Sequence, residues 1–187
     1  MGADSKFTEL RALLAEARLA PEKVSYGSTG EGGIFHATAV VWERLAGIKL
    51  LHVPYKGAAD SMTALLGGQV DASFGAYEEM KAMIDAGRIR PLALFSRSRL
   101  PALPNVPTVT ELGMPVALDN MKGLMAPAGL PSPVQQYLHD AFRKAMQTQD
   151  WKDYVVRSGL TQDYADGAAF QEEIDEAYEL IGKSLGR

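Results

Sequence analysis

Apolar residues follow two alternating patterns through the first half of the chain. Short apolar runs bounded by turn-forming residues predict buried strands at 24–26, 49–53, 70–74 and 91–95. Between these runs, apolar residues with helical spacing predict helices at 34–46, 59–66 and 77–85. Because parallel strands need crossover connections, which are usually helices, this alternation predicts an α/β fold with a parallel sheet.

The segments on either side of this region follow a different plan. Residues 7–18 predict an amphipathic helix, with Ser5 or Thr8 as its N-cap and Pro21 beyond its end. After a proline-rich connection the sequence predicts two isolated strands, at 121–126 and 160–164. It also predicts three helices, one ending near 147, one from about 150 to 159 and one over 167–184.

Two isolated strands are too few to form a second sheet. We therefore expect one complete α/β lobe over 22–118. Residues 1–21 and 119–187 are expected to be the remainder of a second lobe, whose missing strands would precede residue 1.

Composition fits a globular domain and excludes several classes of function. The 187 residues are 47% hydrophobic, which suits one domain or two small lobes. A net charge of −4 without any Lys/Arg-rich run does not favour a nucleic-acid partner. The absence of cysteine excludes thiol catalysis and disulfides. No window approaches eighteen apolar residues, and the first residues lack the apolar core of a signal peptide, so we expect a soluble domain.

The segment Gly27-Ser28-Thr29-Gly30-Glu31-Gly32-Gly33 is the strongest candidate for chemistry. It lies between a predicted strand and a predicted helix, where glycines allow a ligand to approach the backbone closely. The first turn of the helix adds unpaired N–H groups and the positive end of the helix dipole. We therefore predict a carboxylate or phosphate site that uses Ser28, Thr29, Gly30, Gly32 and Gly33.

Other interpretations of the loop remain open. It could be only a tight turn in which Ser28 or Thr29 caps the helix. A P-loop is excluded because Ile34, rather than a Lys-Ser/Thr pair, follows the last glycine. A dinucleotide-binding loop would need a third glycine where the chain has Phe35.

Residues at the other strand ends could complete this site. The carboxyl ends of parallel strands meet at one edge of a sheet, which here would carry Tyr55-Lys56-Gly57 and Gly75 beside the glycine loop. His36, in the first turns of the helix after the loop, could either hold a ligand carboxylate or simply pack. His52, in mid-strand, is interpreted as structural.

Catalytic and metal chemistry are weakly indicated. No two histidines have metal-ligand spacing, so we expect no metal and no cofactor. Ser28 lacks the strained Gly-x-Ser-x-Gly turn of a serine hydrolase, and its base would have to be His36.

Six motifs in order along the chain carry a family resemblance. They are the glycine loop with His36, Val53-Pro54-Tyr55-Lys56-Gly57, Ala64-Leu65-Leu66-Gly67-Gly68-Gln69-Val70-Asp71, Gly87-Arg88-Ile89-Arg90-Pro91-Leu92-Ala93, the segment from Leu103 to Gly113, and Gly123-Leu124-Met125-Ala126-Pro127-Ala128-Gly129-Leu130-Pro131. Together they resemble the Bug family, the TctC-like receptors of tripartite tricarboxylate transporters. The family often has a hydroxyl residue in place of Gly33 and an Asp-Asn pair near Gly75.

The resemblance implies a type II periplasmic-binding-protein-like fold whose two lobes hold a small carboxylate between them. It implies a receptor without catalysis or cofactor, located in the periplasm, that works with membrane transporter subunits and binds di- or tricarboxylates or acidic amino acids. The alternatives are a small α/β enzyme acting on an anionic metabolite and a relative that no longer binds ligand. From the uncovered apolar faces of 7–18 and 121–187 we also expect a homodimer.

Overall fold

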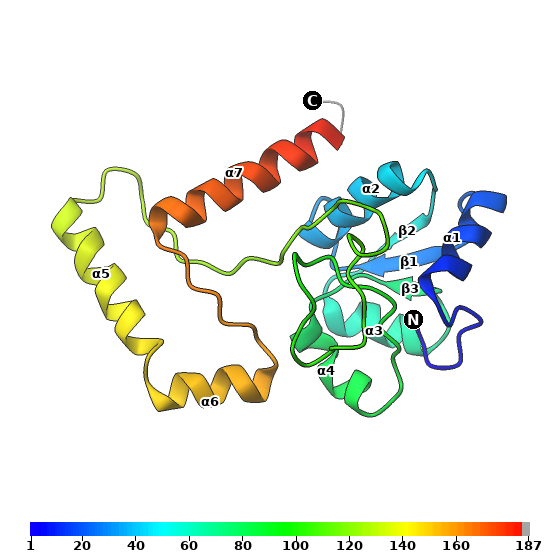
Figure 1. The fold of residues 1–187 in the computed structure, drawn as a ribbon, viewed down its shortest axis with the longest axis horizontal. Helices are drawn as coiled ribbons and strands as arrows, with labels where there is room; N and C mark the ends of the chain where they lie inside the picture. The colour runs from blue at the N-terminus through cyan, green and yellow to red at the C-terminus, as the bar shows by residue number, and fades with distance from the viewer. Residues whose placement is uncertain (185–187) are drawn as a thin grey trace.

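The computed structural model describes residues 1–184 as an α/β lobe with an open arm of helices on one side (Figure 1). Its elements in chain order are α1 (Leu10–Leu19), β1 (Ser25–Ser28), α2 (Ile34–Ala46), β2 (Leu51–Pro54), α3 (Ala58–Leu66), β3 (Ala72–Ser73), α4 (Tyr77–Asp85), α5 (Ser132–Ala145), α6 (Gln149–Ser158) and α7 (Gly167–Ser184). We call residues 1–118 the lobe and residues 119–184 the arm.

The sheet of the lobe is parallel, as the sequence predicts. Its strand order is β2-β1-β3, so β1 is the central strand. In register, Tyr26 pairs with His52 and with Ala72, and Gly27 pairs with Val53 and with Ser73. The chain leaves β1 toward β2 and then crosses to the opposite side for β3. The strand order therefore reverses at the carboxyl ends of β1 and β3, which is the usual ligand position in such sheets.

Helices cover the sheet on both faces. On one face, α1 and α2 pack over β1 in the larger core cluster, which includes Tyr26, Trp42 and Val109. On the other face, α3 and the residues after α4 form a smaller cluster around Leu65 and Ile89. Side chains alternate along a strand, so Tyr26 and Ser28 lie on the α2 face of β1, and Gly27 lies on the α3 face.

The N-terminal segment belongs to the packing of the lobe. Phe7 and the apolar face of α1 are buried in the same cluster as Val24 and Trp42. The expected cap also differs. The N-cap residue of α1 is Glu9 without a side-chain cap bond, and Ser5 instead accepts a hydrogen bond from the Phe7 amide at 3.2 Å.

The strand expected at 91–95 is reduced to a single bridge between Leu94 and Thr108. Around it the chain is held by turns and side-chain bonds. The Arg99 guanidinium binds both carboxylate oxygens of Glu111, at 3.0 and 2.9 Å, and the Pro104 carbonyl at 2.8 Å. The apolar residues of this stretch therefore pack onto the core without extending the sheet, as Leu92 and Phe95 do.

The arm has a different character. In the described part of the chain, no residue after Leu118 is buried, and the strands expected at 121–126 and 160–164 do not form. From the lobe, the chain runs out to α5, turns through α6, and returns along α7 toward α2 (Figure 1). Residues 185–187, which were expected to continue this part, lie outside the described residues.

Several contacts fix the arm to the lobe or to itself, including ion pairs of Arg97 with Glu176 and of Lys122 with Glu78. Arg44 at the end of α2 donates to the Lys183 carbonyl at 2.6 Å, which anchors α7. Gly159, just after α6, lies so close to α4 that a Cβ there would be 2.7 Å from the Tyr77 ring. Gly123 lies against the Phe170 ring of α7 in the same way. The arm thus surrounds a hollow of about 1910 Å³ between itself and the lobe.

Candidate functional site

The glycine loop connects the carboxyl end of β1 to α2, and its backbone leaves donors unpaired. Gly30 and Gly32 have φ angles of +113° and +76°, which side chains rarely adopt, so these two positions require glycine. Gly33 is the N-cap residue of α2 and makes no side-chain cap bond. The amides in the first turn of α2 therefore have no partner within the helix, as an anion site requires.

A second open helix start lies next to the first. Gly57, at the carboxyl end of β2, is the N-cap residue of α3 and likewise makes no side-chain cap bond. The two loops touch, because the Tyr55 amide donates to the Ser28 carbonyl at 2.9 Å and a Cβ on Gly30 would lie 3.9 Å from the Tyr55 carbonyl oxygen. Two helix dipoles therefore present their positive ends at the same edge of the sheet.

The third helix start at this edge is already occupied. The carboxylate of Glu79 accepts a hydrogen bond from the Ala76 amide at 3.1 Å, at the N-terminus of α4. The chain thus caps α4 with its own carboxylate, whereas neither α2 nor α3 has a side-chain cap bond, although Asp60 lies in the first turn of α3. This contrast favours α2 and α3 as the positions for a carboxylate from outside.

Ser28 does not face a ligand directly. Its side chain is fully buried, and its Oγ lies 2.8 Å from His52 Nε2 and 3.1 Å from the Gly30 carbonyl. Ser28 therefore braces the loop from beneath and does not cap α2. This geometry also removes it as a nucleophile, because a hydroxyl without solvent access cannot reach a substrate.

His36 contacts both the loop and a neighbouring ring, so its position fits both of its predicted roles. Its Nδ1 accepts a hydrogen bond from the Gly32 amide at 3.0 Å. Its ring stacks on the His52 ring at 4.1 Å with an interplanar angle of 9°. His52 in turn stacks on Tyr26, with ring centroids 4.9 Å apart, so three rings from α2, β2 and β1 form one stack behind the loop.

His52, which the sequence interpretation took as structural, packs directly behind the loop. It contacts Ser28 and His36 at once, and burial together with the neighbouring His36 charge lowers its pKa, while Glu31 acts in the opposite direction. The signal was present in the strand register. Once β1 and β2 are aligned, His52 pairs with Tyr26 and lies on the same face as Ser28.

The structure brings together one part of the predicted site and leaves another part aside. Ser28, Gly30, Gly32, His36 and Tyr55 are connected by the contacts above. The remaining predicted residues follow the carboxyl ends of β1, β2 and β3 at the same edge of the sheet, namely Thr29, Gly33, Lys56, Gly57 and Gly75. Gly27 and Gly75 have packing roles, since a Cβ would lie 2.6 Å from Ser61 Oγ at Gly27 and 2.5 Å from Met80 Cε at Gly75.

The large hollow reaches this edge from the side of β3. Its lining includes Phe35 and Thr38 of α2 and Ser73, Phe74 and Gly75 at the end of β3. This is where the strand order reverses, although Ser28 to Gly33 do not themselves line the hollow. Arg90 lines it too, and among the described residues its Nη1 is buried without a hydrogen-bond partner.

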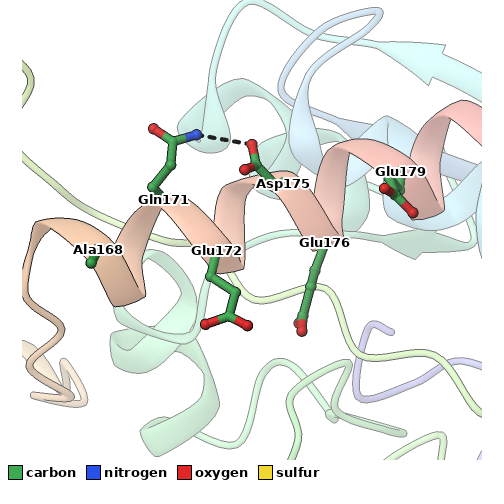
Figure 2. Close-up of a pocket in the computed structure, with 6 residues that line it drawn as sticks. All are labelled: Ala168, Gln171, Glu172, Asp175, Glu176 and Glu179. Atoms are coloured by element: carbon green, nitrogen blue, oxygen red, sulfur yellow. Dashed lines mark hydrogen bonds between the residues drawn. The ribbon is translucent and has the colours of Figure 1, made fainter.

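A smaller depression of about 370 Å³ lies on α7 and has the wrong charge for an anion. Figure 2 shows Glu172 and Glu176 projecting from one side of the helix, with Asp175 accepting a hydrogen bond from Gln171 at 2.9 Å. With Glu179, four carboxylates line this surface, which would repel a carboxylate ligand. Within residues 1–184, no group of three or more His, Cys, Asp or Glu side chains is arranged to hold a metal ion.

The lobe has a fold like that of periplasmic binding proteins, and comparison with known proteins assigns the family. The sequence matches the family described as "Tripartite tricarboxylate transporter family receptor" (TctC) over residues 1–183. The chain therefore belongs to this family of solute-binding receptors, as the motifs indicate. None of the helices described in residues 1–184 is long and apolar enough to cross a membrane.

Relatives and solved structures agree with this assignment. A Cupriavidus necator protein, "UPF0065 protein in gbd 5'region", is 34% identical over 98% of this chain and 57% of its own length. A TctC solute-binding protein from Polaromonas is 26% identical, with a TM-score of 0.84 over 100% of this chain and 64% of that one. MatC from Rhodopseudomonas palustris, solved with bound malate, is 22% identical, with a TM-score of 0.79 over 96% of this chain and 64% of that one.

These matches confirm the predicted fold class. The chain spans less than two thirds of the length of these relatives, in agreement with one complete lobe and one incomplete lobe. The division of the second lobe between 1–21 and 119–187 stays a prediction.

Proposed function

We propose that this chain binds small carboxylates at the glycine loop and provides one side of a receptor's ligand site. The observation that carries the proposal is the pair of helix starts without side-chain caps, at α2 and α3, beside a loop whose glycines have positive φ. A dicarboxylate or tricarboxylate fits this edge because each carboxylate oxygen can accept hydrogen bonds from backbone amides. Membership of a carboxylate-receptor family supports the same ligand class.

The proposed role is binding without catalysis. Ser28 pairs with His52 near the loop, but the Ser28 side chain is fully buried and lacks access to a substrate. We further propose that the receptor acts in the periplasm and passes its ligand to the membrane subunits of a tripartite carrier, the assembly named in the family's description.

The experiment is a calorimetric titration with malate, citrate and glutamate against the parent and Gly32→Val. At Gly32, a Cβ would meet nothing within 4 Å and would project into the space open to a ligand, so we expect binding to be lost. Gly47→Val is the matched control. Gly47 lies at the other end of α2, with a similar φ of +63° and equally open space, so it carries the same backbone strain away from the loop.

Two milder variants measure how much individual side chains contribute to ligand affinity. Thr29→Val removes one hydroxyl and is expected to weaken binding by about 1 kcal/mol. Lys56 is exposed, so Lys56→Ala should act through the local potential, and its effect should shrink as salt rises. If Gly32→Val binds all three acids as well as Gly47→Val does, the loop is only a turn and the proposal fails.

We also propose that a second copy of the chain covers the arm in solution. The arm exposes large apolar side chains that a monomer would leave in water, including Tyr137, Phe142 and Val156. Light scattering should then give twice the mass of one chain. A monodisperse monomer that binds no apolar dye would exclude the homodimer.

A further inference from the structure

The central amide of the loop already has a partner. The Gly32 N–H donates to His36 Nδ1 at 3.0 Å, so this nitrogen must carry a lone pair. The neutral ring therefore holds its proton on Nε2. A ligand carboxylate that takes the Gly32 amide must displace His36 from it.

Protonation would break this contact without any ligand. An imidazolium has N–H groups at both nitrogens and cannot accept a hydrogen bond. Once His36 is protonated, the Gly32 amide and the ring become two donors facing one position, and only an acceptor between them satisfies both. A carboxylate is such an acceptor, and it brings the opposite charge.

The groups around the two stacked histidines bear on which of them can be protonated. His52 lies face to face with His36 at 4.1 Å, and two imidazolium rings at that distance repel each other. Burial of His52 disfavours its charged form, and His36 is the ring whose Nδ1 contacts the loop. The other charged groups at this edge are Glu31 in the loop, the exposed Lys56 and Asp60 in the first turn of α3, while burial raises the pKa of Tyr26 and keeps it neutral.

α7, the helix packed against α2, does not extend to the N-terminal end of α2. It meets α2 at the last turn, where Arg44 binds the carbonyls of Lys183 and Ser184. His36 is in the first turn of the same helix.

We propose that His36 acts as a proton-linked latch. Its neutral ring occupies the Gly32 amide, and a carboxylate ligand displaces the ring by binding together with one proton. This inference rests on the proposed function of the loop. It adds that the site prefers a carboxylate over a neutral acceptor, because only an anion stabilises the imidazolium. It also adds that affinity depends on pH through a group of the protein.

The first test is calorimetric titration of the full chain with malate at pH 6.5, 7.25 and 8.0 and constant ionic strength. Each titration is repeated in two buffers with different heats of ionisation. We expect affinity to fall as the pH rises, by at most about tenfold per pH unit, which is the limit for one linked proton. Malate binding should be accompanied by proton uptake, seen as a binding heat that depends on the buffer's heat of ionisation.

His36→Asn is the diagnostic variant, because an amide oxygen can accept from Gly32 but the side chain does not titrate. It should bind malate more weakly, with no dependence on pH and no proton uptake. His139→Gln removes the histidine of α5 and should leave the pH dependence intact. Malate binding by the parent with the same affinity at all three pH values and no proton uptake would overturn the latch while leaving the carboxylate site standing.

A second measurement needs no ligand. In the free protein, the Gly32 amide resonance should follow the titration of the His36 ring, because the bond between them breaks on protonation. An amide resonance that stays constant while His36 titrates would overturn the latch even if no malate binds. A loss of malate binding at every pH, with the amide still following His36, would refute the proposed function and not the contact.

Discussion

The lobe and the arm have equally regular patterns of apolar residues, but only the lobe buries them. Every buried hydrophobic side chain in the described residues lies in 1–118. In the arm, helices with a clear apolar face leave residues such as Tyr137, Phe142 and Tyr178 exposed. The difference shows that amphipathic spacing specifies a helix and a face, whereas burial requires a second surface at the right place.

Two tryptophans test this contrast most sharply, because the chain has one in each region. Trp42 is buried between Phe74 and Phe95, and its Nε1 points at Met114 Sδ. Trp42→Ala should lower the free energy of unfolding by about 3–5 kcal/mol. Trp151, which is half-buried on α6, should cost about 1 kcal/mol or less on replacement by alanine.

Urea unfolding followed by circular dichroism measures both tryptophan variants. Equal losses would mean that the arm and the lobe unfold as one unit, and the distinction between them would have to be abandoned.

Removal of a side-chain carboxylate that joins two strands of the sheet should produce the next largest loss of stability. The Asp71 carboxylate accepts from the Ser25 amide at 2.8 Å and from the Ser25 hydroxyl at 2.9 Å, which holds the starts of β1 and β3 together. Asp71→Ala should therefore cost about 2 kcal/mol in unfolding experiments. Asp140→Ala, which removes an exposed carboxylate of the arm, serves as the control and should leave the urea midpoint nearly unchanged. A larger shift for the arm variant would invert the comparison.

Limited proteolysis should separate the two regions in time. Trypsin should cut first in the arm, at residues such as Lys122 or Lys144, because its helices have few buried contacts to protect them. The lobe should persist as a fragment that keeps the fluorescence of buried Trp42. Early cleavage at Arg18 or Arg44, before any cut after residue 118, would contradict this order.

Mild acid should have the smallest effect, and it should act on the lobe. The pKa of His52 is lowered in the folded state, so the unfolded chain binds a proton more readily. The stability contributed by neutral His52 is complete above the ordinary histidine pKa and is lost as the pH falls from there to the lowered value. Urea midpoints measured from pH 7.5 to 5 should therefore decline more steeply for the parent than for His52→Gln. Parallel declines would assign the acid sensitivity to other groups.

Helices were predictable from the sequence to within a few residues because each has its own periodic face and its own end signals. The bounds of α2, α4 and α7 match the predicted ranges. Strands were predicted less well. Residues 91–95 form a typical apolar run, but their partner is one bridge to Thr108, which no local pattern encodes. The runs at 121–126 and 160–164 likewise lack neighbouring strands in the described chain.

The site was predictable where backbone chemistry determines it and unpredictable where tertiary contacts do. The positive φ angles of Gly30 and Gly32 and the open start of α2 follow from local glycine content. The stack of the Tyr26, His52 and His36 rings forms only where two strands and a helix meet in the folded chain. The sequence alone therefore made His52 look like a core residue. The buried position of Ser28 has the same origin.

Two glycines that close the arm have a consequence for how such chains evolve. At Gly123 and Gly159, even one methyl group would collide with an aromatic ring, that of Phe170 or of Tyr77. Both positions are outside the hydrophobic core, so a substitution there would not act through the stability of the core. It would instead push apart the segments of the chain that enclose the hollow. Among natural variants, we expect these two glycines to change less often than the exposed apolar residues beside them, since the shape of the hollow depends on the absence of a side chain.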